Sequence, residues 1–547
     1  MKTSRCIILC ALSFSILLNP IGFSQAARAR LAAGLNAIRA ANLRADVTFL
    51  ASAPLEGRRS LDRGSEAAAQ FIAAEFAKAG LKPANGDSYF QDVPLIEYRP
   101  DLQQTTVTVT RNNERQQFAY YTDFFGRSPR ETTVSGRVVF AGYGITAPEY
   151  DYDDYAGLDV RGKIVLIFDH EPQENDPRSV FNGIGNTRHA NAQVKLLNAQ
   201  KRGAAGVLTA PEPHRKHPSA QERIGRVPGI RERFMKSNAQ ILAENESLIP
   251  GFSISDQMTA QLLAPHKPAE LQAAIDAKLK PASFEIPGAE VQIKVVNAFR
   301  RTGASPNVIG MIEGSDPTLK NETIIFSAHY DHDGLRDGVM FPGADDNASG
   351  TAGVIELARA FSRNPARPKR TLLFAVFASE EQGLLGSYYY ARHPLRPLDS
   401  TRVVINFDMI GRNEAPSAQT EGLMEIAADT SNELNLIGTI NSPDYRAAVE
   451  AANLRVGLAL NYKWDKDAAL NVYQRSDHFP FSLHDIPAVW WFTGFHPDYH
   501  QPTDTADKLN YAKMEKIVRL AYLTGWIFAD QRKAPRYEAK SANSDRR

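Results

Sequence analysis

Four apolar runs in the second half of the chain predict buried strands. The runs TIIFSAHYD, TLLFAVFAS, RVVINFDMIG and PAVWWFTG are nearly continuous, as expected for strands that are covered on both faces. Helix-like segments lie between them, including ASGTAGVIELARAFSR at 348–363. This alternation predicts an α/β fold in which helices flank a mostly parallel central sheet.

Weaker patterns predict further elements before and after this region. Residues 33–52 and 64–80 are expected to be helical, and residues 103–125 alternate between polar and apolar like exposed strands. A final amphipathic helix is expected at 511–531, and the polar tail 534–547 is expected to be disordered.

The stretch 132–265 changes in composition and predicts a small inserted β-rich domain. Its runs GRVVFAGYGI and GKIVLIFDH precede a helix-like segment, NAQVKLLNAQKRGA, and a third apolar run, AGVLTA. Residues 211–236 are rich in proline, arginine and lysine without clear periodicity, which favours a solvated loop over a lid that contacts substrate. The main domain would then comprise residues 27–131 and 266–533.

The first residues, 1–26, are typical of a signal peptide. Lys2 and Arg5 precede an apolar run from Cys6 to Leu18, and Ser24-Gln25-Ala26 fits a cleavage site. The apolar run is short for a membrane span. We therefore expect an exported, periplasmic or secreted protein that is not stably inserted in a membrane after signal removal.

Overall composition excludes one class of partner. Hydrophobic residues make up 43% of the 547 residues, charged residues make up 23%, and the formal net charge is +1. This is the balance of an ordinary globular protein. Without a basic excess, a nucleic-acid partner is not expected. The oligomeric state stays open.

Histidine and carboxylate side chains gather where the four strands end. Open parallel sheets bind ligands outside the carboxyl ends of their strands, so these side chains are expected to share one rim of the sheet. They are His329 and Asp331 after the first run, Glu380 and Glu381 after the second, Asp408 after the third and His500 after the fourth, with Asp346 just ahead of the helix at 348–363.

This set of side chains predicts metal-assisted hydrolysis. Imidazole nitrogens and carboxylate oxygens suit zinc, and one carboxylate can bridge two ions about 3.5–4 Å apart. Glu380 and Glu381 cannot point the same way on a regular strand, so one can bind metal while the other holds a water. His332 and His478 are expected to line the site without binding metal. Six further histidines have no such setting and are interpreted as structural or surface residues: His170, His189, His214, His217, His266 and His393.

Several segments resemble the di-zinc aminopeptidases of metallopeptidase family 28, in the branch with an inserted protease-associated domain. These segments are SAHYDHDG, GADDNASGTAG, FASEEQGLLGS, NFDMIGR, RSDHFPF and YHQPTDTADKL, with LASAPLEGRR nearer the N-terminus and GKIVLIFDH and KRGAAGVL in the insertion. The resemblance implies a fold of the zinc exopeptidase type and a peptide substrate cleaved at its N-terminus.

The resemblance also implies a role for each site residue. His329 and Asp408 would hold one of two Zn²⁺ ions, Glu381 and His500 would hold the other, and Asp346 would bridge them. Glu380 would be the general base, and Asp331 would hydrogen-bond His329. A cis peptide bond is implied between Asp346 and Asn347. The inserted domain, which offers no ligand set of its own, would shape access to the site.

Three alternatives remain open at the level of sequence. A carboxypeptidase of the same family would need a cation for the substrate's carboxylate, and four arginines are candidates: Arg301, Arg336, Arg412 and Arg475. A glutaminyl cyclase-like acyltransferase would use one zinc. An inactive binding module would retain the fold without the chemistry. The side-chain preference at the cleaved residue is not predicted.

Overall fold

The computed structural model describes residues 25–126, 128–176, 178–181, 186–226, 232, 235–467, 469–470 and 472–538. The predicted signal peptide lies outside these residues except for its last two, which begin the helix α1 (Gln25–Ala37). Within the described residues, no helix is both long and apolar enough to cross a membrane.

The centre of the main sheet is parallel, as predicted. Strands β18 (Thr371–Phe377), β15 (Thr323–His329), β19 (Thr401–Phe407) and β22 (Ala488–Phe492) pair in that order and run in one direction. They correspond to the four apolar runs, and every residue of β15, β18 and β22 is buried.

Antiparallel strands extend this centre on both sides, so the complete sheet is mixed. On one side β14 pairs with β18, β2 with β14 and β11 with β2, while the short β1 also pairs with β14; on the other side β20 pairs with β22 and carries β21. The bounds are β1 (Lys82–Pro83), β2 (Phe90–Pro100), β11 (Ala239–Leu242), β14 (Asn297–Ile312), β20 (Glu433–Ile437) and β21 (Ala459–Asn461).

Alternate residues of the central strands face two separate cores, because successive side chains of a strand point to opposite sides. Ile324 and Phe326 of β15 belong to the larger core, which the helices on one face cover, whereas Ile325 belongs to the smaller core on the other face. The helices of the larger core are α1, α2 (Ala40–Leu50), α3 (Arg63–Lys78), α9 (Gly350–Arg363), α11 (Pro443–Asn453) and α13 (Tyr511–Asp530), and those of the smaller core are α10 (Leu385–Arg392) and α12 (Phe479–Ser482).

A second sheet of eight strands forms a separate domain. Its order is β4-β3-β13-β6-β9-β10-β12-β5. The bounds are β3 (Thr106–Arg111), β4 (Glu114–Phe118), β5 (Phe124–Gly126), β6 (Thr132–Phe140), β9 (Ile164–Phe168), β10 (Gly206–Ala210), β12 (Gly251–Ile254) and β13 (Phe284–Val295). Its helices are α4 (Ala192–Lys201), α5 (Ala220–Arg226), α7 (Asp256–Leu263) and α8 (Pro268–Lys278). A small hairpin in the same domain pairs β7 (Thr146–Ala147) with β8 (Tyr152–Asp153), and another in the main domain pairs β16 (Gly334–Arg336) with β17 (Val339–Phe341).

This domain is wider than the predicted stretch 132–265. Strand β3 and strand β13 lie outside that stretch, yet they pair with each other, and β13 also pairs with β6. The sequence places residues 103–125 in the main domain, because an alternating pattern alone does not identify the strand with which they pair. Their pairing with residues far along the chain places them in the second domain.

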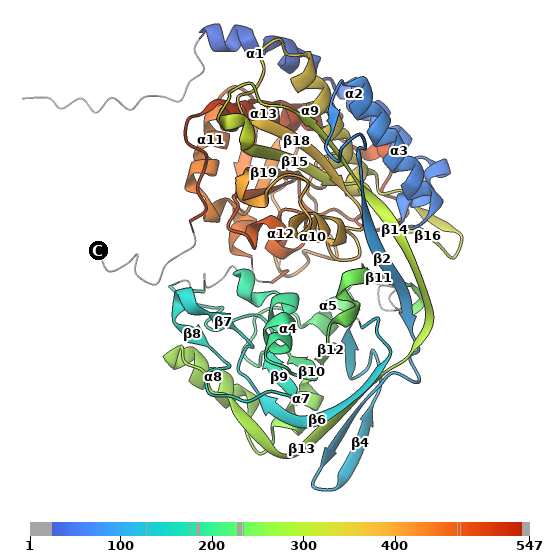
Figure 1. Ribbon diagram of the computed structural model, residues 1–547, viewed down its shortest axis with the longest axis vertical. Helices are drawn as coiled ribbons and strands as arrows, with labels where there is room; N and C mark the ends of the chain where they lie inside the picture. The colour runs from blue at the N-terminus through green and yellow to red at the C-terminus, as the bar shows by residue number, and fades with distance from the viewer. Residues whose placement is uncertain are drawn as a thin grey trace, which may run out of the picture.

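Two long strands join the domains. Strands β2 and β14 pair antiparallel from Phe90 opposite Val308 to Pro100 opposite Asn297, and Figure 1 shows them running from the main sheet down to the second domain. Beyond α13, the predicted tail makes contacts over its first residues, since the amide of Glu538 donates to the carbonyl of Asn441 at 2.8 Å. Residues 539–547 of that tail lie outside the described residues.

Candidate metal centre

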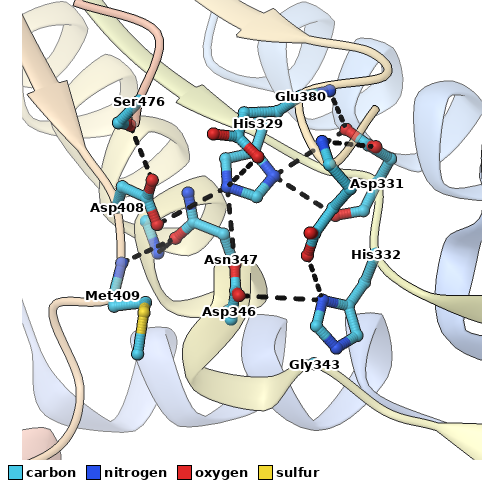
Figure 2. A network of polar contacts seen from close by, with 12 residues as sticks. His329, Asp331, His332, Gly343, Asp346, Asn347, Glu380, Asp408, Met409 and Ser476 are labelled. Carbon is cyan, nitrogen blue, oxygen red and sulfur yellow. Dashed lines mark hydrogen bonds and ion pairs between the residues drawn. The ribbon is translucent and has the colours of Figure 1, made fainter. Parts of the chain in front are cut away.

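His329 at the end of β15 faces three carboxylates. Its Nε2 lies 3.5 Å from Asp346 Oδ1, 3.5 Å from Asp408 Oδ1 and 3.8 Å from Glu380 Oε2, an arrangement visible in Figure 2. Asp408 directly follows β19, and its other oxygen accepts a hydrogen bond from Ser476 Oγ at 2.6 Å. The strand ends therefore bring these predicted residues together.

A second group forms around His500, in the loop after β22. His500 Nε2 lies 3.1 Å from Asp346 Oδ2 and 3.3 Å from Glu381 Oε2, while its Nδ1 lies 2.9 Å from Asp333 Oδ2. Glu381 also contacts His332, whose Nδ1 lies 2.7 Å from Oε1. His332 thus contacts a predicted ligand directly, whereas His478 packs its ring between Tyr473 and Trp490.

Asp346 lies between the two histidines, with one carboxylate oxygen toward each. The loop that carries it is held at both ends: Asp504 Oδ2 accepts the amides of Asp345 and Asp346 at 2.9 and 3.2 Å. Asn347 Nδ2 donates to the carbonyl of Phe407 at 2.9 Å. The Asp346–Asn347 peptide bond is cis, as the family resemblance implied.

Asp331 positions the two glutamates rather than His329. Its carboxylate accepts the amide of Glu380 at 2.9 Å and that of Glu381 at 3.4 Å. The expected hydrogen bond from His329 to this carboxylate is not formed, because Oδ1 is 3.8 Å from Nδ1. Instead the backbone carbonyl of Asp331 lies 3.2 Å from Nδ1 and can accept its proton, leaving Nε2 free to face the carboxylates.

The electrostatics of the pocket attract cations. Burial lowers the pKa of His329, but the carboxylates of Glu380 and Asp408 outweigh it and raise this pKa well above its ordinary value. Burial raises the pKa of Glu380 well above its ordinary value, against the opposing effect of His329. A divalent cation would be attracted by the same negative charge and would displace protons from its ligands.

These residues fit zinc. His329 Nε2 is buried and makes no hydrogen bond among the described residues, although carboxylate oxygens surround it. Two groups of side chains that could each hold an ion share Asp346. The first group consists of His329, Asp346 and Asp408. The second consists of Asp346 and Glu381 together with His332 or His500. Nitrogen and oxygen donors in such groups are those that zinc takes.

Arg58 supports the pocket and was not singled out by the sequence, although it lies in LASAPLEGRR. Its side chain is fully buried, and its guanidinium donates to the carbonyls of Tyr330, Pro342 and Gly343, which flank the predicted ligands. Burial lowers its pKa to about 10, while nearby carboxylates, Asp331 first, oppose this shift. A buried cation that bonds only backbone carbonyls leaves the carboxylates of the site available to metal.

A cleft of about 410 Å³ opens onto the site between the two domains. Glu380, Glu381 and His500 line it. Further lining residues come from both domains and include Tyr98, Tyr120, Tyr121, Gln382, Leu384, Gln474 and Arg475. Aromatic side chains beside these polar groups can hold a substrate side chain in the cleft.

The main domain matches a known family. Residues 307–524 match the family model described as Peptidase family M28. The chain contains a Peptidase family M28 domain. The matched range includes every predicted site residue, so the resemblance seen in SAHYDHDG and its companions is confirmed there. The second domain lies outside the match, and its protease-associated character stays a prediction.

Known proteins similar to this chain include an aminopeptidase. The chain is 33% identical over 210 residues to the uncharacterized protein YfbL of Escherichia coli, covering 36% of this chain and 64% of that protein. It is 27% identical over 242 residues to aminopeptidase YwaD of Bacillus subtilis, covering 42% of this chain and 46% of that protein. The chain thus spans less than two thirds of the length of these relatives. A solved aminopeptidase from Aneurinibacillus sp. strain AM-1 has a TM-score of 0.49 and 22% identity, over 93% of this chain and 96% of that one.

Proposed function

We propose that the protein is a zinc-dependent exopeptidase, an aminopeptidase that removes residues from peptide N-termini. The observation that carries the proposal is the position of Asp346, whose two carboxylate oxygens face His329 and His500 while Glu380 lies beside them. The M28 domain and the aminopeptidase among its relatives support it.

Five side chains would hold two Zn²⁺ ions. His329 and Asp408 would bind one ion, and Glu381 and His500 would bind the other. Asp346 would bind both ions. Bound in this way, the ions would lower the pKa of a water molecule and polarise the scissile carbonyl.

Glu380 would move the proton. It lines the cleft, and its backbone amide donates a hydrogen bond to the carboxylate of Asp331 at 2.9 Å. As water adds to the carbonyl carbon, Glu380 takes one of its protons; when the C–N bond breaks, Glu380 returns that proton to the leaving amine. The residue therefore begins and ends the cycle as a carboxylate.

The aminopeptidase among the relatives favours the amino end of a peptide. Carboxylates also line the cleft beside Glu380, although Glu381 is a proposed metal ligand and Asp333 pairs with Arg336. The second domain would shape access, since Tyr120 and Tyr121 come from it. We further propose that the protein acts outside the cytoplasm, because residues 1–26 have the pattern of a signal peptide.

A carboxypeptidase is the second candidate, and Arg475 is the observation that favours it. Of the four candidate arginines, Arg336 and Arg475 line the cleft. Arg336 pairs with Asp333, whereas Arg475 Nη2 donates to Tyr499 Oη at 3.1 Å and its guanidinium lies over the Phe495 ring. Arg475 could therefore accept a substrate carboxylate without breaking an ion pair.

Capped peptides distinguish these functions. We expect cleavage of a leucyl peptide whose C-terminus is amidated, and loss of cleavage when the same peptide is N-acetylated instead, because only a free amino end would be bound. Rates of product release measured by chromatography give the result. The opposite pattern would favour the carboxypeptidase, and no cleavage of either peptide by the zinc-loaded protein would favour the acyltransferase or the inactive module.

A further inference from the structure

Four metal-binding side chains meet inside the second domain, far from the M28 match. His170, Glu174, Glu212 and His217 are 1%, 8%, 3% and 8% exposed, respectively. One donor atom from each can be chosen so that all four lie within 4.8 Å of one another. From the sequence alone no ligand set is expected in this domain, and both histidines are interpreted as structural or surface residues, so the proximity of the four side chains is a finding of the structure.

The ends of two adjacent parallel strands bring these residues together. His170 lies two residues after β9 and Glu212 two residues after β10, and these strands pair in parallel in the second domain (Figure 1). The amide of Asp169 donates to the carbonyl of Ala210 at 2.8 Å, which ties the two strand ends. His170 adopts a positive φ of 45°, a turn that few non-glycine residues make.

Glu174 lies between the two imidazoles. Its Oε1 is 2.6 Å from His170 Nδ1, and its Oε2 is 2.9 Å from His217 Nε2. This is the arrangement that Asp346 has between His329 and His500 in the M28 domain. In both places one carboxylate turns an oxygen to each of two histidines.

Hydrogen bonds do not account for all the nitrogen and oxygen atoms of this cluster. His217 Nδ1 lies 3.2 Å from the carbonyl of Pro218, which can only accept, and Nε2 lies 2.9 Å from Glu174 Oε2. In a ring whose single proton is on Nδ1, Nε2 would present a lone pair to Glu174, as a metal ligand does. Glu212 Oε1 is buried without a hydrogen bond among the described residues, 3.1 Å from His170 Nδ1 and 3.8 Å from His217 Nε2.

We propose that these four side chains bind a further divalent metal ion, Zn²⁺ by the type of its donors. Two imidazole nitrogens and two carboxylate oxygens form a closed four-ligand set, which is typical of structural rather than catalytic zinc. Ligands at about 2.1 Å in a tetrahedron lie about 3.4 Å apart, and the four separations between a histidine nitrogen and a glutamate oxygen here run from 2.6 to 3.8 Å. The charge of the ion neutralises both glutamates, which are costly to bury unpaired.

Such an ion would hold in place the segment after β9, which is linked by hydrogen bonds to the proposed catalytic cleft. Glu171, next to His170, accepts hydrogen bonds from the amide and hydroxyl of Thr187 at 2.8 and 2.6 Å. The carbonyl of Thr187 in turn accepts from Gln474 at 3.3 Å, and Gln474 lines the cleft. The ion would thus stabilise the second domain where it meets the M28 domain.

Zinc content tests the proposal without reference to hydrolysis. Protein equilibrated in zinc-buffered solution is measured by mass spectrometry of the metal, for the wild type and for the His217→Ala and Glu212→Ala variants. We expect each variant to bind one equivalent less per chain than the wild type. His189→Ala is the matched control, since His189 is also buried in this domain but bonds Glu149 outside the cluster; it should keep the wild-type content.

Anomalous diffraction of the wild-type protein at the zinc edge decides the matter even if a variant does not fold. We expect a peak bonded to His170, Glu174, Glu212 and His217 at about 2.0–2.2 Å. Absence of that peak in zinc-soaked crystals, or variants with unchanged zinc content, would overturn the proposal. Because peaks at His329 and His500 are observed separately, failure of the catalytic assignment would be recognised independently.

Discussion

Replacing Glu380 with glutamine should lower turnover by about 10²–10⁴-fold, the usual cost of losing a general base. Glutamine has the shape of glutamate but cannot take a proton from water. Glu380 Oε2 lies 3.8 Å from His329 Nε2, at the edge of the group of proposed metal ligands. The substitution should therefore leave these ligands in place. Steady-state kinetics on a leucyl peptide, with metal content measured in the same sample, gives the result.

Two further variants make this result specific. Asp408→Ala removes a proposed ligand and should lower metal content together with turnover. Glu313→Gln makes the same chemical change as Glu380→Gln at an exposed ion pair with Lys82 and should change neither. If Glu380→Gln kept turnover close to the wild type, another residue would be the base.

The Asp346→Asn variant should lose at least one metal equivalent and most of the activity. Both oxygens of Asp346 are used, one toward His329 and one toward His500, and an amide offers an oxygen to only one side. Metal analysis after equilibration at limiting zinc measures the loss.

The matched control for this change is Asp316→Asn. Asp316 is a partly exposed residue of the same domain that accepts the amides of Thr318 and Leu319, each at 2.9 Å, and asparagine can accept them as well. It should bind zinc like the wild type. Unchanged metal content in Asp346→Asn would show that Asp346 does not bridge the ions.

The sequence was sufficient for the centre of the fold because the central strands are buried on both faces. Continuous apolar runs identify such strands without an alignment, and the strand ends then place His329, Glu380 and Asp408 at one rim. The strands outside this centre could not be assigned to a sheet in the same way. Strand β3 alternates between polar and apolar residues although Val107 to Val109 are buried, and its pairing with β13, about 180 residues later, assigns it to the second domain.

Residues that act over long distances in the chain were also missed. Arg58 reaches the carbonyls of Pro342 and Gly343, and Asp504 reaches the amides of Asp345 and Asp346. No local pattern marks such contacts, because their partners are backbone groups. His170 differs, since it follows an apolar run just as His329 does. The strand-end rule applied to the second domain would have found it.

The dependence of hydrolysis on metal tests the central claim most directly. The protein is dialysed against a strong chelator until metal analysis shows it to be metal-free, and cleavage of a leucyl peptide is followed as zinc is added back. The proposed site predicts no hydrolysis in the metal-free sample and its return with zinc, because a metal ion activates the water and polarises the carbonyl. Full activity in the verified metal-free protein would contradict it.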